Sequence, residues 1–322
     1  MLINMEDKIL TLLKKEKGYL SGEDISEHFG ISRAAIWKHI EELRSQGYEI
    51  EAAPHLGYRL VSAPDRLLAD EIAWELQTKL IGKKIYSFDS LDSTMDFAYE
   101  LGLKNSPEGT IVCAETQKKG RGRMGRSWAS PRYKGIYFSV ILRPQIMPNE
   151  APKLTILSAV AVREAIEKIS GLNPLIKWPN DILVNDKKVA GILAEMQAET
   201  DAVKFVVIGI GINVNTDKSL LPPKATSLKE ERGEEISRIV LLQEILRLIE
   251  NYYFLFQDKG FSPIAEEWKK HSAILGHHVK ILYHHKTIEG EAVDLDCDGA
   301  LLVRKDSGFI EKVLAGDVVK VR

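Results

Sequence analysis

The sequence predicts an α+β protein of several domains, and three observations support this fold class. The chain has 322 residues, of which 44% are hydrophobic, so it is long enough for two or three domains with sizeable cores. The first sixty residues show helical periodicity followed by two short strands, the middle mixes strands with helices, and the end contains short strands only. We therefore expect a winged helix-turn-helix, a central α/β domain with a mixed sheet, and an SH3-like β-barrel.

Residues 1–64 show the pattern of a winged helix-turn-helix. Ile36, Ile40 and Leu43 are spaced i, i+4, i+7 in a helix that Ser32 caps, and two short strands follow it. In this fold the third helix enters a groove of DNA. However, residues 1–63 contain eight Lys/Arg and ten Asp/Glu, without the basic excess of many DNA-binding domains. A winged helix that binds protein is therefore the alternative. The candidates for DNA contact are Ser32, Arg33, Trp37 and Lys38.

The rest of the chain divides into a linker helix over residues 65–83, a central domain over 84–272 and a final domain over 273–322. The polar segment from Thr216 to Glu235, with its two adjacent prolines, is expected to act as a mobile flap. Strands are expected at 84–89, 110–115, 135–142, 175–184, 189–195 and 206–215, and helices at 65–80, 93–101, 152–170, 237–256 and 263–272. Five short strands separated by turns are expected after residue 277.

The most informative stretch is the loop from Gly120 to Trp128, in which three glycines and three arginines alternate. Glycine allows a ligand to approach the backbone, and arginine carries donors that fit phosphate and carboxylate. From Thr116 to Asn149 there is no Asp or Glu, whereas there are eight Lys/Arg. Ordinary surface loops mix the two signs of charge. The loop therefore favours an anion-binding site over a merely solvated basic loop.

Two familiar phosphate-binding motifs also match this loop, and both are rejected. Gly120-x-Gly122-x-x-Gly125 fits the dinucleotide fingerprint, and the same loop nearly fits a Walker A motif. Each motif requires a helix directly after the loop, so that the helix N-terminus can bind phosphate. Here the strand-like residues 135–142 follow instead. We therefore expect the loop to join two strands.

Other residues are open to a structural explanation. On the sequence alone, Ser93 and Thr94 are explained by helix capping, and Lys188 by a place in a polar turn. The segment from Lys177 to Asp181 is less ordinary, because it places polar side chains around Pro179 inside an apolar strand. Gly209 and Gly211 mark a strand where something approaches the backbone closely.

Composition excludes several classes of protein. No apolar run is long enough to span a bilayer, and the N-terminus lacks a signal-peptide pattern. Only two cysteines occur, without a CxxC motif, so neither a disulfide framework nor a zinc site is indicated. We expect a cytoplasmic protein that does not bind a membrane.

Two motifs together carry a resemblance to a known family. Gly120-Arg121-Gly122-Arg123-x-Gly125-Arg126-x-Trp128 and Lys177-Trp178-Pro179-Asn180-Asp181, with Lys188-x-Ala190-Gly191 after the turn, resemble biotin protein ligase. The order of domains is similar to that of the bifunctional form, which is both a biotin ligase and the biotin-operon repressor. The resemblance covers nearly the whole chain.

The resemblance implies a two-step reaction. Biotin and ATP, with Mg²⁺, form biotinyl-5′-AMP and release pyrophosphate, and the biotinyl group then passes to a lysine of a biotin carboxyl carrier domain, such as that of acetyl-CoA carboxylase. It further implies repression at operator DNA by a homodimer that assembles through the catalytic domains when biotinyl-AMP is bound. Residues 1–64 would then be the DNA-binding domain and 84–272 the biotin- and ATP-binding catalytic domain.

The resemblance also implies roles for individual residues, while it assigns no metal ligand. Some family members have Asn at the position of Met95, and others have Met as here. The implied catalytic residues are Arg123, Lys188 and Asp181. The implied biotin-binding residues are Ser93, Thr94, Met95, Gln117, Arg121, Gly122, Arg123, Lys188 and Gly191. The implied ATP- and adenylate-binding residues are Arg123, Arg126, Trp128, Lys177, Asn180, Asn213 and Arg322.

Three alternatives stay open at this point. The chain is a ligase whose winged helix does not bind DNA, a sensor that binds an acyl-adenylate without catalysis, or a lipoate or octanoate transferase. DNA footprinting, labelling of a carrier domain and competition between substrates separate these alternatives.

Overall fold

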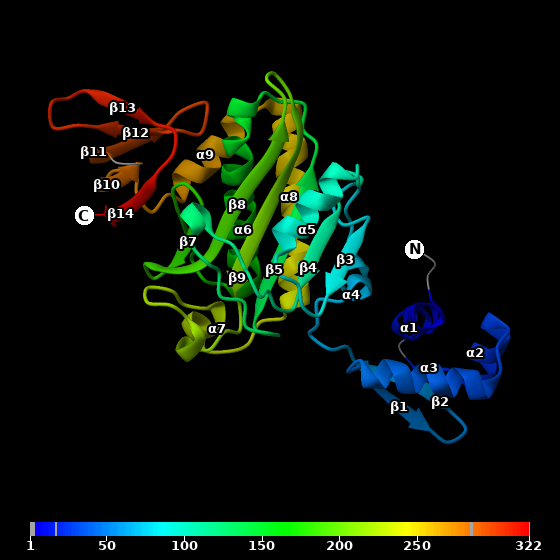
Figure 1. Cartoon of the computed structure of the whole chain (residues 1–322). Helices are drawn as coiled ribbons and strands as arrows, with labels where there is room; N and C mark the ends of the chain where they lie inside the picture. The colour runs from blue at the N-terminus through cyan, green and yellow to red at the C-terminus, as the bar shows by residue number, and fades with distance from the viewer. Residues whose placement is uncertain (1–3, 17, 284–285, 322) are drawn as a thin grey trace. The chain divides into compact units, whose positions relative to one another are not determined.

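The computed structural model describes residues 4–16, 18–283 and 286–321 (Figure 1). The chain forms two compact units, residues 1–65 and 66–322, and each is described by itself. Within the described residues, no helix has the length and apolar character needed to cross a membrane.

The first unit is a winged helix-turn-helix, as predicted. Ile36, Ile40 and Leu43 are buried in its core. The Arg44 guanidinium donates two hydrogen bonds to the Ile50 carbonyl oxygen, at 3.0 and 2.6 Å, so the hairpin is fixed to the third helix. Its elements are α1 (Met5–Lys15), α2 (Gly22–Phe29), α3 (Arg33–Ser45), β1 (Glu49–Ala53) and β2 (Gly57–Ser62).

The second unit is built on a seven-stranded sheet with the order β3-β4-β5-β9-β8-β7-β6. The sheet is mixed, as predicted, because β3 and β4 pair in parallel while the other neighbours pair antiparallel. The strands are β3 (Ile85–Phe88), β4 (Ile111–Ala114), β5 (Gly135–Leu142), β6 (Leu175–Lys177), β7 (Asp181–Val184), β8 (Lys187–Ala198) and β9 (Val203–Asn213).

Helices cover both faces of this sheet (Figure 1). α6 (Pro152–Ser170) and α8 (Arg238–Lys259) pack on one face over the main core, and α9 (Ser262–Lys270) joins them. α5 (Thr94–Leu103) packs on the other face, where Met95, Ala98 and Phe205 belong to a smaller core. The segment expected to be a flap contains η3 (Lys218–Leu220) and α7 (Leu228–Arg232), and a further short helix, η2 (Pro148–Glu150), precedes α6.

The expected linker helix over 65–80 is much shorter in the structure. Only α4 (Ala69–Ala73) is helical, because side chains of α8 bind the backbone at its end and beyond it. The Gln243 amide donates to the carbonyl oxygens of Glu71, Ile72 and Trp74. The Glu250 carboxylate accepts hydrogen bonds from the backbone N–H groups of residues 79–81, at 2.6–2.8 Å. These tertiary contacts replace the i→i−4 bonds of a helix.

The expected single strand over 175–184 is in fact the hairpin of β6 and β7. Trp178, Pro179 and Asn180 form its turn. Pro179 has no N–H to donate to a sheet ladder, which is why the strand is interrupted there. The turn brings Lys177 and Asp181 opposite each other, and both face the cavity described below.

The last part of the chain is a five-stranded antiparallel sheet with the order β13-β12-β11-β10-β14. It has the strand content of the expected SH3-like domain. In the described strand pairings it is an open sheet, with β13 and β14 at its edges. Its strands are β10 (His278–Tyr283), β11 (Lys286–Leu295), β12 (Leu301–Arg304), β13 (Ile310–Val313) and β14 (Asp317–Val321).

A buried ion pair connects the sheet to α8. Arg238, at the start of α8, donates to Glu115 Oε2 at 2.6 Å and to the Gly135 carbonyl oxygen at 3.1 Å. The other carboxylate oxygen of Glu115 accepts from the Leu67 N–H at 2.6 Å. Leu67 is thereby fixed two residues after the boundary between the two units.

Candidate active site

A cavity of about 490 Å³ opens above the carboxyl-terminal half of β9 and the start of β8. Its volume lies within the range of small-molecule sites. The cavity gathers every site residue predicted from the sequence in the central domain. These are Ser93, Thr94, Met95, Gln117, Arg121, Gly122, Arg123, Arg126, Trp128, Lys177, Asn180, Asp181, Lys188, Gly191 and Asn213. Arg322 lies outside the described residues.

Three glycines of β8 and β9, Gly191, Gly209 and Gly211, form the floor of the cavity. Gly191 and Gly211 are paired across β8 and β9, and a Cβ atom on Gly211 would lie 2.5 Å from the Trp128 indole. A Cβ on Gly209 would lie 2.5 Å from the Met95 side chain. Glycine is therefore required for these side chains to lie directly on the sheet. Gly209 and Gly211 are two residues apart on one strand, which separates the two contacts by about 7 Å.

A chain of polar side chains borders the Met95 end of the floor. Thr94 donates from both its N–H (2.9 Å) and its hydroxyl (3.1 Å) to the Gln117 side-chain oxygen, and the Gln117 amide donates to the Ser130 hydroxyl at 3.1 Å. Ser93 caps α5 through the Asp96 N–H, at 3.3 Å. Ser93 and Thr94 are almost fully buried, so polar groups are held in a largely dry environment.

The sequence prediction missed Ser139, which extends this chain. Its hydroxyl donates to the Thr94 hydroxyl at 2.9 Å, and it lies opposite Gly209 on the neighbouring strand. Ser139 is fully buried in the apolar strand β5. Ser139 is the only serine or threonine of this eight-residue apolar strand. That is the signal that would have indicated it, because a buried hydroxyl needs a partner.

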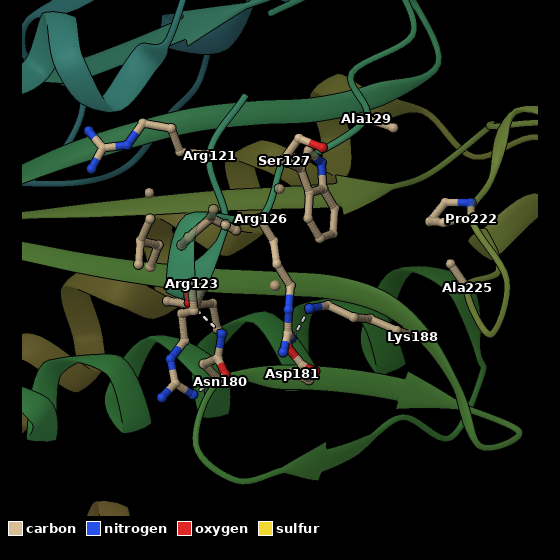
Figure 2. A pocket seen from close by; sticks show the side chains of 18 of the residues that line it. Arg121, Arg123, Arg126, Ser127, Ala129, Asn180, Asp181, Lys188, Pro222 and Ala225 are labelled. Carbon is tan, nitrogen blue, oxygen red and sulfur yellow. Dashed lines mark hydrogen bonds and ion pairs between the residues drawn. The ribbon is translucent and has the colours of Figure 1, made fainter. Parts of the chain in front are cut away.

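The glycine–arginine loop joins β4 to β5, as predicted, and folds back on itself. The Trp128 N–H donates to the Gly120 carbonyl at 2.8 Å, and the Gly122 N–H to the Arg126 carbonyl at 2.7 Å. Between them lies the short 3₁₀ turn η1 (Arg123–Gly125). Figure 2 shows that Arg123 and Arg126 point toward Asn180 and Asp181, whereas Arg121 points the other way.

The outward direction of Arg121 follows from its partners. Its guanidinium is ion-paired with Asp96 on α5 and with Glu195 on β8. The Arg121 backbone therefore remains at the cavity, and its charge is held outside. Of the three loop arginines, Arg123 and Arg126 are the ones that supply positive charge to a ligand in the cavity.

Arg123 is the more enclosed of these two arginines. Burial lowers the pKa of its guanidinium, and the nearby carboxylates of Asp317 and Asp181 act in the opposite direction. Arg123 Nη1 donates to Asn180 Oδ1 at 3.0 Å, and the Asn180 amide donates to the Ile192 carbonyl at 2.8 Å. The position of Arg123 is therefore fixed by the β6–β7 turn.

Two lysines bring further positive charge to the cavity. Lys188 Nζ lies 2.5 Å from Asp181 Oδ1 and 5.4 Å from the centroid of the Trp128 ring. Burial lowers the pKa of Lys177, which the Asp181 carboxylate partly opposes. A phosphate or carboxylate in the cavity would stabilise the charged form of Lys177.

Two segments that the sequence analysis did not assign to the site also line it. Pro222, Lys224 and Ala225 come from the expected flap, where the Lys224 carbonyl accepts a hydrogen bond from the Lys188 N–H at 3.0 Å. Asp317, Val318 and Val319 come from β14. Both contributions depend on contacts between distant parts of the chain, so no local pattern indicates them.

The candidate DNA-contact residues are exposed at the start of α3 in the first unit. Ser32 caps α3 through the Ala35 N–H at 3.2 Å. Arg33, Trp37 and Lys38 of α3 are all exposed, and the Trp37 side chain is 57% exposed.

Comparison with known proteins supports the same division of the chain. Residues 6–59 match the model of the HTH domain, 87–213 that of the biotin/lipoate A/B protein ligase family, and 274–321 that of the biotin protein ligase C-terminal domain. The bifunctional ligase/repressor BirA of Bacillus subtilis is 44% identical over 304 residues, which cover 93% of each chain. The chain belongs to the bifunctional ligase/repressor group of biotin protein ligases.

Other relatives of this biotin protein ligase agree. The bifunctional ligase/repressor BirA of Escherichia coli is 32% identical over 97% of this chain and 95% of its own. The structure of the Aquifex aeolicus biotin protein ligase in complex with biotin and ATP superposes with a TM-score of 0.64 and 32% identity, covering 74% of this chain and 99% of that one. The expectation of a biotin ligase fold is therefore confirmed.

Proposed function

We propose that this protein joins biotin and ATP into biotinyl-5′-AMP, transfers the biotinyl group to a lysine of a biotin carboxyl carrier domain, and represses biotin genes when the adenylate is bound. The observation that carries this proposal is the composition of one cavity. A dry polar chain over a glycine floor adjoins a cluster of four cations, Arg123, Arg126, Lys177 and Lys188. Such a cavity fits a small polar ring at one end and phosphates at the other.

The polar chain would hold the ureido ring of biotin. A ureido group presents two N–H donors and one carbonyl acceptor, and Ser93, Thr94 and Gln117 offer hydroxyl and amide groups that match them. Their burial makes each lost hydrogen bond costly, which favours the correct ring over a lipoyl chain. Met95, Gly122, Gly191 and the backbone of Arg121 would complete the walls.

In the first step a biotin carboxylate oxygen attacks the α-phosphorus of ATP, and pyrophosphate leaves. Both reactants are anions, so their repulsion must be offset by positive charge held in place. Arg123 and Lys188 would lie at the reacting groups, with Arg126 and Lys177 along the phosphates. Trp128, Asn180 and Asn213 would contact the nucleotide, and the family resemblance adds Arg322.

In the second step the amine of the carrier lysine attacks the carbonyl carbon of the adenylate, and AMP leaves. The carrier lysine is an ammonium at neutral pH, and it must lose one proton before its amine can act as a nucleophile. Asp181 is the carboxylate nearest to Lys188, and we assign it to orient the amine and accept the proton.

The residues of the cavity also fit Mg²⁺ that enters with ATP. In the described part of the chain, no group of three or more His, Cys, Asp or Glu side chains is placed to hold a metal ion. Mg²⁺ commonly needs only one or two carboxylates in addition to substrate phosphates. Asp181 would be the protein ligand, and the ion would neutralise charge on the phosphate chain.

The ligase activity is tested by mass spectrometry of a carrier domain mixed with the protein, biotin, ATP and Mg²⁺. We expect a mass gain of one biotin on the carrier lysine. Arg123→Ala should lower the rate of pyrophosphate release by about 100-fold or more. Arg132→Ala is the matched control, because Arg132 belongs to the same cationic stretch but pairs with Asp89 outside the cavity. Retention of biotinyl-AMP without carrier labelling would favour the sensor, and labelling with lipoate would favour the transferase.

The repressor activity is tested by footprinting on the promoter of the biotin genes. Protection should require biotin and ATP together. Arg33→Ala and Lys38→Ala should weaken binding, whereas Lys15→Ala, which removes an exposed charge from α1, should not. Absence of protection under all conditions would favour a ligase whose winged helix does not bind DNA.

We propose that DNA binding requires a homodimer formed through the second unit. β8 runs to Ala198, whereas β7 pairs only with residues 187–191 of β8, so the edge of β8 beyond residue 192 has no strand partner in the described sheet. A free edge can pair with a second copy. Arg121 pairs with Glu195 on this edge, which connects the ligand loop to it. Sedimentation with biotin and ATP should show a dimer, and Lys188→Ala should remain a monomer.

A further inference from the structure

The C-terminal sheet places one carboxylate inside the cavity. Asp317 is the first residue of β14, and its side chain is 13% exposed. Its Oδ2 accepts a hydrogen bond from Arg126 Nη2 at 2.5 Å, and its Oδ1 lies 3.5 Å from Arg123 Nη1. Arg123 Nη2 also donates to the Gly316 carbonyl oxygen, at 3.2 Å. Both inward-pointing arginines of the loop therefore bind the same turn.

The position of Asp317 is fixed by the sheet behind it. Asp317 pairs with Leu282 on β10. The preceding residue, Gly316, has a φ of 147°, and a Cβ there would lie 2.6 Å from Ile281 and 2.9 Å from the Leu282 carbonyl oxygen. A side chain at position 316 would not fit, so the backbone of the turn lies directly against β10. The sheet thereby places Asp317 beside the two arginines.

The two carboxylates of the cavity form ion pairs with different cations. Asp181 is paired with Lys188 at 2.5 Å, and Asp317 is paired with Arg126 and Arg123. The arginines therefore have a counter-ion before any ligand arrives. An incoming anion must compete with Asp317 for them, because a guanidinium has a limited number of donors in a fixed plane.

We propose that Asp317 is a positioning residue that competes with the phosphate chain of ATP for Arg126 and Arg123. It holds the arginines over the empty cavity, releases them to the phosphates when ATP binds, and takes them back as pyrophosphate leaves. This inference rests on the proposed function, since it requires ATP in this cavity. It assigns to the C-terminal sheet a part in the release of a product.

The test compares the wild-type protein with Asp317→Asn, using inorganic pyrophosphate as the probe. Asn keeps an oxygen that accepts from Arg126 but loses the charge. We expect calorimetry to show pyrophosphate bound about three- to tenfold more tightly by Asp317→Asn, because a competing anion has been neutralised. The KM for ATP should fall, and kcat should fall with it because pyrophosphate leaves more slowly. Biotin affinity should change less than pyrophosphate affinity, because Arg126, the closer partner of Asp317, is assigned to the phosphates alone.

Two further variants separate this role from a structural one. Asp317→Glu restores the charge and should return pyrophosphate affinity toward that of the wild type. Asp298→Asn removes another ion-paired aspartate of the C-terminal sheet, which pairs with Lys312 at 2.5 Å outside the cavity, and should leave pyrophosphate affinity unchanged. A residue needed only for folding would raise both KM values and lower Tm without tightening pyrophosphate binding.

The outcomes distinguish this inference from the function on which it rests. Equal or weaker pyrophosphate binding by Asp317→Asn, with normal biotin binding and carrier labelling, overturns the role of Asp317 alone. If the wild-type protein binds neither biotin nor pyrophosphate, the proposed function itself fails.

Discussion

Arg238 Nη1 lies 2.6 Å from Glu115 Oε2 in an ion pair whose two side chains are 0% and 4% exposed. Glu115 directly follows β4, two residues before Gln117, and also holds the Leu67 N–H. A buried pair of this kind contributes little relative to an apolar replacement, but removal of one partner leaves the other charge without compensation. Substitution of either partner should therefore destabilise the segment that leads from β4 to Gln117.

We expect Arg238→Ala to lower the free energy of unfolding by about 3–5 kcal/mol. Urea unfolding of the full chain measures this loss. Arg232→Ala is the control, because Arg232 pairs with the exposed Glu234 and such surface pairs contribute about 0–1 kcal/mol. A loss below about 1 kcal/mol for Arg238→Ala would mean that water or a rearranged side chain compensates Glu115.

Two glycines on β9 allow the two ends of the cavity to be tested separately. Gly211→Ala places a Cβ 2.5 Å from Trp128 and should raise the KM for ATP by about tenfold or more. Gly209→Ala places a Cβ equally close to Met95 and should act on the KM for biotin instead. Steady-state kinetics with each substrate varied in turn measures both. The same effect of both variants on both KM values would contradict the assignment of two ends.

The pKa of Lys177 predicts a pH dependence of ATP binding. Burial lowers this pKa below the ordinary value of 10.5. As pH rises through the lowered pKa, Lys177 loses its proton and its attraction for phosphate. The KM for ATP should therefore begin to increase at a lower pH than it would if Lys177 had the ordinary pKa of a lysine. Lys177→Arg stays charged and should remove this increase, and an unchanged alkaline profile would exclude Lys177 from ATP binding.

The two cysteines should differ in reactivity and in their effect on stability. Burial raises the pKa of the Cys113 thiol from 9.0 to about 12, whereas Cys297 is exposed. A thiol reagent should label Cys297 alone in the native protein and both after denaturation. Between pH 9 and 12 the Cys113 thiol ionises in the unfolded state but stays protonated in the folded state. The contribution of Cys113 to the free energy of unfolding is therefore complete below pH 9 and is lost as pH rises toward 12.

Urea unfolding at pH 8 and pH 10 checks the second effect. Cys113→Ala should show a smaller loss of stability between these two pH values than the wild-type protein, by up to about 1.4 kcal/mol. Cys297→Ser should behave as the wild type does. If Cys113→Ala and the wild-type protein lose equal stability, Cys113 does not contribute to the alkaline decrease.

The part of the site that could be predicted is the part that local sequence patterns indicate. The loop from Gly120 to Trp128 concentrates one sign of charge among glycines, and the strands beside it are apolar enough to be recognised. Ser139 and Asp317 were not predicted, because their roles depend on the residues that lie opposite them in the sheet or across the cavity. The linker was misjudged for the same reason, since Gln243 and Glu250 bind a backbone about 170 residues away in the sequence.

The fixation of Leu67 limits the reach of the first unit. β2 ends at Ser62, and the Leu67 backbone is held by Glu115 and Ser87. Five Cα–Cα steps separate Ser62 from Leu67, and five steps span at most about 18 Å. In the proposed dimer, each DNA-reading helix would be carried on such a short tether. The second helix would then meet its half-site at a high effective concentration, and only operators with a narrow range of half-site spacings would be bound by both helices.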